Sequence, residues 1–63
     1  MHRKHAIEMV KSYTFDELMD WKKHVLFCLQ WHKKDNNRIE IEDCEFLLKE
    51  IEDQMLKLKP KDT

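Results

Sequence analysis

The chain contains no glycine, and its one proline is Pro60, near the end. Two-residue β-hairpin turns need residues that tolerate positive φ, usually glycine, so a sheet of tight hairpins is disfavoured. No stretch approaches the roughly 20 apolar residues of a membrane-spanning helix. Residues 1–10, MHRKHAIEMV, also lack the apolar core of a signal peptide. We therefore expect a cytoplasmic protein that is not bound to membranes, in which the two cysteines are free thiols.

Charge is abundant but nearly balanced. The net charge of −1 argues against strong non-specific attraction to nucleic acid or to anionic membranes. The two halves of the chain differ, however: residues 1–34 hold seven Lys/Arg and four Asp/Glu, whereas residues 35–63 hold five and nine. With 41% hydrophobic residues as well, this composition is typical of amphipathic helices and not of a disordered chain.

The stretch from Thr14 to Lys34 has the clearest helix signals, and we expect it to be the central helix of a small bundle. Thr14 followed by Glu17 forms a capping box, which predicts a helix over residues 15–34. Apolar or half-apolar residues recur on it at steps of three and four, the spacing of a helix–helix seam. The members of this seam are Leu18, Trp21, Val25, Cys28 and His32.

A second long helix is predicted after the turn signal Asp35-Asn36-Asn37, over residues 38–59, with Pro60 ending it. Its seam has the same spacing and consists of Ile41, Cys44, Leu48, Ile51, Met55 and Leu58. If the chain folds back near Asn36, Val25 packs near Leu48 and Leu18 near Met55. Residues 2–12 form a short third helix that must dock on the other two, because an isolated helix of this length is unstable in water.

These patterns predict an all-α protein of a single domain, residues 1–63. Its architecture is an antiparallel helical hairpin, about 15–34 and 38–59, with the short N-terminal helix packed on it. So small a domain buries only about 60% of the surface of its unfolded chain, and its core alone is marginal. The 15–34 helix is apolar in three directions, more than two neighbouring helices can cover. We therefore expect a homodimer, which completes the hairpin as a dimeric helical bundle.

The apolar residues left outside the seam are the candidate partner-binding site. Phe27 and Trp31 lie one turn apart on the side away from the seam, and Met19 and Leu26 lie on one flank. Exposed apolar groups of this size mark interaction surfaces. An alternative remains open at this point, in which the N-terminal helix or a second subunit covers Phe27 and Trp31.

Metal binding and catalysis find little support. Cys28, His32, Cys44 and Glu40 are zinc-ligand types, but the close Cys pair and close His pair of zinc sites are missing. No glycine-rich loop accompanies the Cys and His residues either. We expect no metal, no cofactor and no enzymatic activity.

The predicted function is protein–protein interaction: a small regulator or inhibitor that acts on a partner protein through helix faces. The chain is also similar in length and expected architecture to plasmid-encoded helical-hairpin dimers such as Rop, although it shares no residue motif with them. That resemblance implies an alternative, nucleic-acid binding through the lysine-rich face of the 15–34 helix. The residues of that face are Lys22, Lys23, Lys33 and Lys34, with Trp31.

Overall fold

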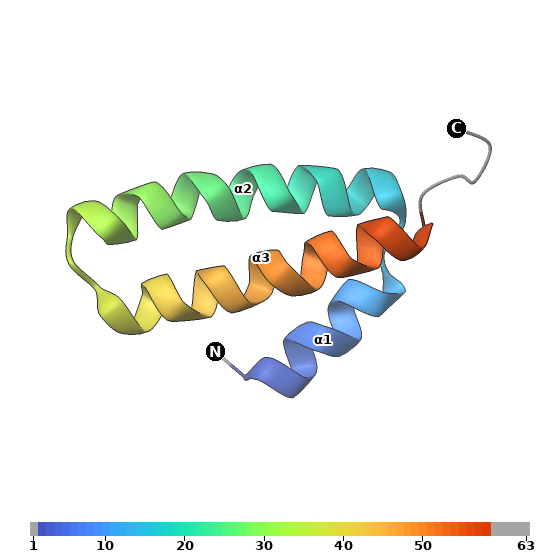
Figure 1. Ribbon diagram of the computed structural model, residues 1–63, viewed down its shortest axis with the longest axis horizontal. Coiled ribbons are helices and arrows are strands. Elements are labelled where there is room, and N and C mark those ends of the chain that lie inside the picture. The colour runs from blue at the N-terminus through green and yellow to red at the C-terminus, as the bar shows by residue number, and fades with distance from the viewer. Residues whose placement is uncertain (1, 59–63) are drawn as a thin grey trace.

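A computed structural model describes residues 2–58, and every regular element in that range is an α-helix (Figure 1). The elements are α1 (Arg3–Ser12), α2 (Phe15–Lys34) and α3 (Arg38–Leu58). The predicted all-α fold is therefore confirmed. The structure has α2 at the predicted residues 15–34, and α3 begins at the predicted residue 38. In contrast, α1 begins at residue 3, one residue later than expected. The predicted end of α3 at residue 59, and the stop at Pro60, lie outside the described residues. No helix within residues 2–58 is long and apolar enough to cross a bilayer.

The start of α2 follows from the capping box. The Thr14 hydroxyl accepts a hydrogen bond from the backbone N–H of Glu17 at 3.2 Å, and the Glu17 carboxylate accepts one from the backbone N–H of Thr14 at 2.8 Å. Two N–H groups that an α-helix leaves without internal partners are thus satisfied. This prediction is confirmed.

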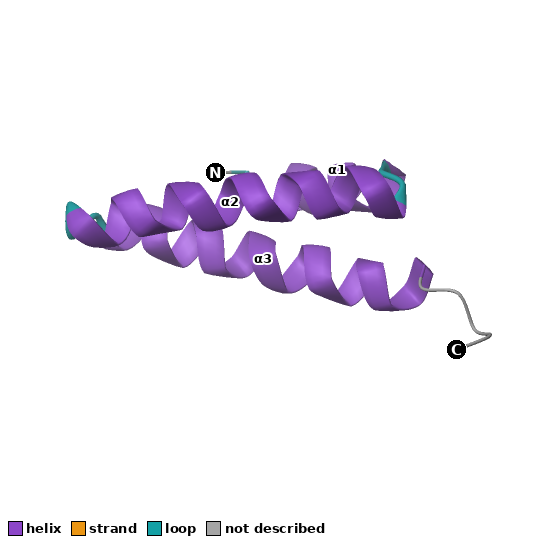
Figure 2. Ribbon diagram, turned by 90° about the horizontal axis from the view of Figure 1, so that it is seen from above, coloured by secondary structure: helices purple, strands orange, loops and turns teal. Residues whose placement is uncertain are grey.

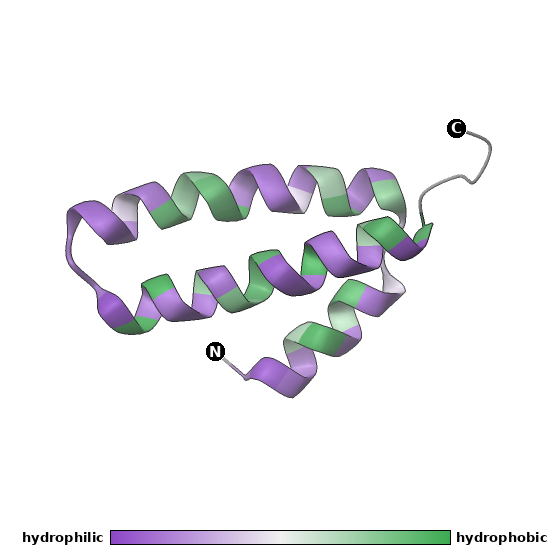
Figure 3. Cartoon of the chain, in the orientation of Figure 1, coloured by the Kyte–Doolittle hydropathy of each residue, from purple (hydrophilic) through white to green (hydrophobic). Residues whose placement is uncertain are grey.

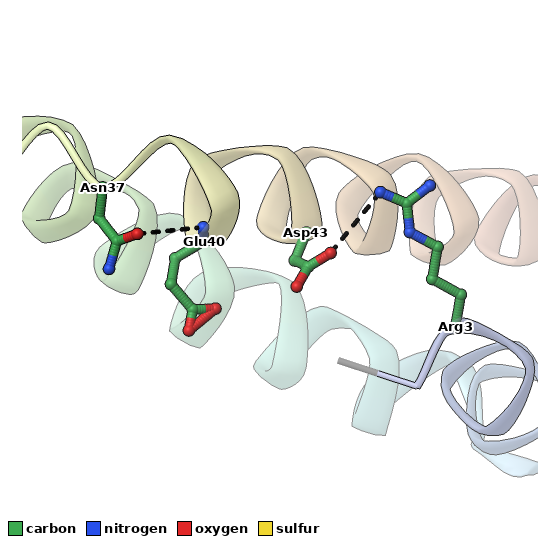
Figure 4. Close-up of polar contacts among 4 residues, drawn as sticks. All are labelled: Arg3, Asn37, Glu40 and Asp43. Carbon is green, nitrogen blue, oxygen red and sulfur yellow. Dashed lines mark hydrogen bonds and ion pairs between the residues drawn. The ribbon is translucent and has the colours of Figure 1, made fainter.

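The turn between α2 and α3 uses asparagine where many chains use glycine. Asn36 has a φ of 57°, in the left-handed region that asparagine tolerates better than most other residues. The Asn37 side-chain oxygen then accepts a hydrogen bond from the backbone N–H of Glu40 at 3.5 Å, in the first turn of α3 (Figure 4). The predicted turn is confirmed, and it allows α2 and α3 to lie side by side in opposite directions (Figure 1).

The middle position in the molecule belongs to α3 and not to α2. Figure 1 shows α3 between α2 and α1, and Figure 2 shows α1 and α2 on the same side of α3. The expectation that residues 15–34 form the central helix is therefore wrong. The reason is that α3 contacts α1 with a second face, in addition to the face that packs on α2. The guanidinium of Arg3 lies 4.7 Å from the centre of the Phe46 ring and 3.6 Å from the Asp43 carboxylate.

The core is small and consists of side chains from all three helices. Leu18 of α2 and Ile51 of α3 are fully buried. Around them pack four more buried residues of the same cluster: Ala6, Val10, Val25 and Leu47. Figure 3 shows hydrophobic and hydrophilic residues alternating along each helix, as expected when one side of a helix is buried.

The predicted seams agree only in part with this core. In α2, Leu18 and Val25 are buried, while Trp21, Cys28 and His32 are half-buried. In α3, Leu47 is buried although it was not in the predicted seam, and Leu58, which was, is exposed. The docking of α1 explains the first difference, because it covers a side of α3 that the two-helix pattern leaves in solvent.

Candidate protein-binding surface

The four residues predicted to bind a partner are all on α2, and all are exposed. The exposed fractions are 59% for Phe27, 53% for Trp31, 41% for Leu26 and 38% for Met19. One alternative required α1 to cover Phe27 and Trp31, but α1 packs mainly on α3 and both rings stay exposed. The four do not form one surface, however, and the structure divides them into two pairs.

The first pair, with its neighbours, makes up what we call the aromatic patch: Phe27, Gln30, Trp31 and Lys34. Phe27 is nine residues from the fully buried Leu18, which is two and a half helical turns and hence the opposite side of α2. The two rings meet edge to face, with centroids 6.1 Å apart and planes at 68°. The ammonium of Lys34 lies 5.5 Å from the centre of the Trp31 ring. These contacts hold the aromatic patch in one arrangement on the outside of the protein.

The second pair belongs to a groove between α2 and α3. Two adjoining hollows make up this α2–α3 groove, and both contain Lys22 and Met55. The remaining lining residues are Phe15, Met19, Lys23 and Leu26 of α2 and Glu52 and Leu56 of α3. An ion pair of 3.3 Å between Lys22 and Glu52 joins the two helices here.

The α2–α3 groove lies on the side of α3 away from α1. Asp43, which pairs with Arg3 of α1, and Glu52, which pairs with Lys22 of α2, are nine residues apart. Nine residues are half a turn more than two full turns, so the two ion pairs mark opposite sides of α3. Sequence reasoning did not assign Phe15, Met55 or Leu56 to a surface. Met55 belongs to the predicted seam of α3. To assign the three residues to one surface, the rotation of α2 relative to α3 must be known, and the sequence does not provide it.

A third hollow, on the α1 side, collects Cys and His residues. Its cavity of about 230 Å³ is lined by Trp21, His24, Val25, Cys28, His32, Glu40, Asp43, Cys44 and Leu47. Both cysteines are free, and the Cys28 Sγ lies 3.6 Å from the Nε2 of His24. Burial, followed by the charges of Cys28 and of nearby carboxylates, raises the pKa of the Cys44 thiol. A raised pKa lowers the fraction of Cys44 present as the thiolate, which is the reactive form of cysteine, at neutral pH.

The four residues considered as zinc ligands, Cys28, His32, Cys44 and Glu40, thus line one cavity. Within residues 2–58, no three or more His, Cys, Asp or Glu side chains are placed to hold a metal ion. The arrangement is a half-buried pair of free thiols that line one cavity. The aromatic patch and the α2–α3 groove are the surfaces left for binding.

Comparisons with protein-family models, with curated proteins and with solved structures found no match.

Proposed function

We propose that this protein is a small cytoplasmic protein-binding module that regulates or inhibits its partner through helix faces, with the aromatic patch as its contact site. The observation that carries the proposal is the position of Phe27 and Trp31. Both rings are more than half exposed, they contact each other, and they lie opposite the buried side of α2.

Exposure of two large rings on so small a protein is unfavourable unless something binds them. An aromatic side chain has about 150–250 Å² of surface. The largest apolar patch on a typical monomer measures about 300–600 Å², so two rings that are each more than half exposed make up a large share of such a patch. Tryptophan is also enriched among the residues that dominate binding energy. Because the edge-to-face contact and Lys34 already order the rings, a partner has less side-chain entropy to remove on binding.

The charge near the aromatic patch suggests the character of the partner surface. Lys33 and Lys34 end α2, and Lys23 lies one turn before Phe27 on the same side. The complementary surface on a partner protein would be a hydrophobic pocket that receives the two rings, with carboxylates at its rim that pair with the lysines. Such a rim adds mainly to association rate and selectivity, whereas the rings supply affinity.

The test is a double variant with a matched control. Phe27→Ala with Trp31→Ala should abolish capture of the partner from an extract of the source cells, and the melting temperature should stay nearly unchanged. Ile39→Ala with Leu58→Ala removes two exposed apolar side chains elsewhere and should retain capture. A double variant at the aromatic patch that keeps its partners, or that unfolds, would contradict the proposal.

A second candidate function is nucleic-acid binding, which the contact between Lys34 and Trp31 favours. Basic side chains beside an exposed ring can bind phosphate while a base stacks on the ring. Fluorescence anisotropy with labelled single-stranded and duplex RNA separates the two functions. Binding that weakens steeply with salt and is lost in Trp31→Ala would support this second candidate over the first.

We further propose that α2 and α3 act as an antiparallel hairpin that a second copy completes as a dimeric bundle. What supports this is the small core, which has seven buried hydrophobic residues within residues 2–58, together with the apolar side chains left exposed on α2 and α3. Domains of this size usually need a disulfide, a metal or a second subunit. The two free thiols fit the second-subunit solution and a reducing compartment.

A further inference from the structure

The two cysteines lie at about the same height in the pair of helices α2 and α3. Cys28 is seven positions before Asp35, which follows the end of α2, and Cys44 is seven positions after Asn37, which precedes α3. Because each residue of an α-helix advances the chain by about 1.5 Å, equal distances from the turn bring two antiparallel helices to the same level. Both cysteines also line the same hollow on the α1 side. The fold thus brings together two free thiols from different helices.

The packing around the two thiols leaves this part of α2 and α3 able to adjust. One turn farther from the connection, Val25 and Leu47 line the same hollow and belong to the buried core cluster. Between them, among residues 26–46, Leu29 is the one buried side chain. The thiols therefore lie where the shared core ends, and few buried contacts oppose a small shift of one helix toward the other. Such a shift allows the separation of about 4.4–6.8 Å between Cα atoms that a disulfide needs.

The surroundings of the two thiols differ, and the difference sets the order in which they react. The Sγ of Cys28 lies 3.6 Å from the Nε2 of His24, and an imidazole with its lone pair on Nε2 accepts a thiol proton. Burial, followed by the charges of Cys28 and of nearby carboxylates, raises the pKa of the Cys44 thiol. A smaller fraction of Cys44 is then thiolate, the form that attacks a disulfide. Cys28 is therefore the first thiol to react and Cys44 the second.

We propose that Cys28 and Cys44 form a site for thiol–disulfide exchange, whose substrates are small aliphatic disulfides such as glutathione disulfide. The product is a disulfide within one chain, which joins α2 to α3 near their connection. In a reducing compartment the site rests as the dithiol, and it is oxidised when small disulfides accumulate. An excess of small thiol reverses the reaction. This inference does not depend on what binds the aromatic patch.

The exchange takes two steps. In the first, the Cys28 sulfur gives its proton to His24 and attacks one sulfur of the small disulfide, whose S–S bond breaks. A mixed disulfide forms on Cys28, and the departing small thiolate takes the proton. In the second, Cys44 loses its proton to solvent and attacks the Cys28 sulfur, which releases the second small thiolate to be protonated. The protein thus gives up two electrons and two protons, and the small disulfide is reduced to two thiols.

The test compares the folded chain with the same chain unfolded in urea. Both are equilibrated without oxygen in mixtures of glutathione and glutathione disulfide, quenched with acid and analysed by mass spectrometry. At a fixed glutathione concentration, the folded chain should form its internal disulfide at about tenfold less glutathione disulfide than the unfolded chain. The same factor stabilises the oxidised fold, so its melting temperature should exceed that of the reduced chain by roughly 5–10 °C. Cys44→Ser should stop at the mixed disulfide on Cys28.

The matched control is Cys44→Ala with Glu45→Cys, which moves the second thiol by one residue. The unfolded chains then close loops of nearly equal length, while position 45 lies 100° farther round α3 and lines a different hollow, with Asn36 and Arg38. The control should lose the advantage of the folded chain over the unfolded one. The proposal would be overturned if the original chain showed no such advantage, if the control kept it in full, or if the disulfide formed only between chains. A Cys44→Ser chain that forms no mixed disulfide would also overturn it.

Discussion

Replacing Ile51 by alanine should destabilise the protein far more than the same replacement at Ile39. Ile51 is fully buried between the three helices, whereas Ile39 is 74% exposed in the first turn of α3. The two variants are chemically identical changes in one helix. Any difference between them therefore measures burial.

The magnitude follows from the groups removed. Truncation of a buried isoleucine removes three carbons, worth about 2.4 kcal/mol at ~0.8 kcal/mol for each. The cavity left behind adds to this, so a total of about 3–4 kcal/mol is expected. The core of so small a domain rarely supplies more than ~3–5 kcal/mol, so Ile51→Ala should be largely unfolded at room temperature. Ile39→Ala should lie within about 0.5 kcal/mol of the original chain.

Urea unfolding followed by far-ultraviolet circular dichroism is the assay, at one fixed protein concentration because a dimer's stability depends on it. If Ile51→Ala and Ile39→Ala lost equal stability, or if Ile51→Ala lost less than about 1 kcal/mol, the packing described for α3 would be refuted.

Four further outcomes are expected. Thr14→Ala removes one bond of the capping box and should cost about 1 kcal/mol in the same urea assay; no loss would show that the cap is dispensable. Cys44, whose pKa is raised, should react with iodoacetamide more slowly than Cys28 in the folded protein and at the same rate in urea, as mass spectrometry of the alkylated peptides would show. Because this thiol holds its proton more tightly when folded, stability should also fall as pH rises above the unfolded thiol's pKa, and Cys44→Ala should flatten that fall. Melting curves with and without EDTA should coincide, whereas a large drop on chelation would indicate a structural metal.

Local features of this fold could be predicted from the sequence because they depend on neighbouring residues. The capping box at Thr14 and the asparagine turn at Asn36 are determined by side chains within three residues of the backbone groups that they satisfy. For the same reason α2 begins and ends where the pattern predicted. The helical fold class followed from the same signals.

The position of α1 could not be predicted, since it depends on contacts between residues about 40 positions apart. The approach of Arg3 to Phe46 and Asp43 has no spacing signature in the sequence. Placing α1 on α3 made Leu47 part of the core and left the outer side of α2 uncovered. The exposed pair Phe27 and Trp31 was found from the sequence, but its separation from Met19 and Leu26 required the orientation of α2 against α3.

Photo-crosslinking from position 31 tests most directly whether the aromatic patch is a binding surface. A benzophenone amino acid would replace Trp31 in one variant and Lys4, an exposed residue of α1, in a matched control. Irradiation in extract of the source cells should join the position 31 variant to a different protein, and the position 4 variant should give no such product. Excess original chain should suppress the crosslink, because it competes for the same partner. A position 31 variant that yields only uncrosslinked chain or crosslinks between its own copies would contradict the proposed function.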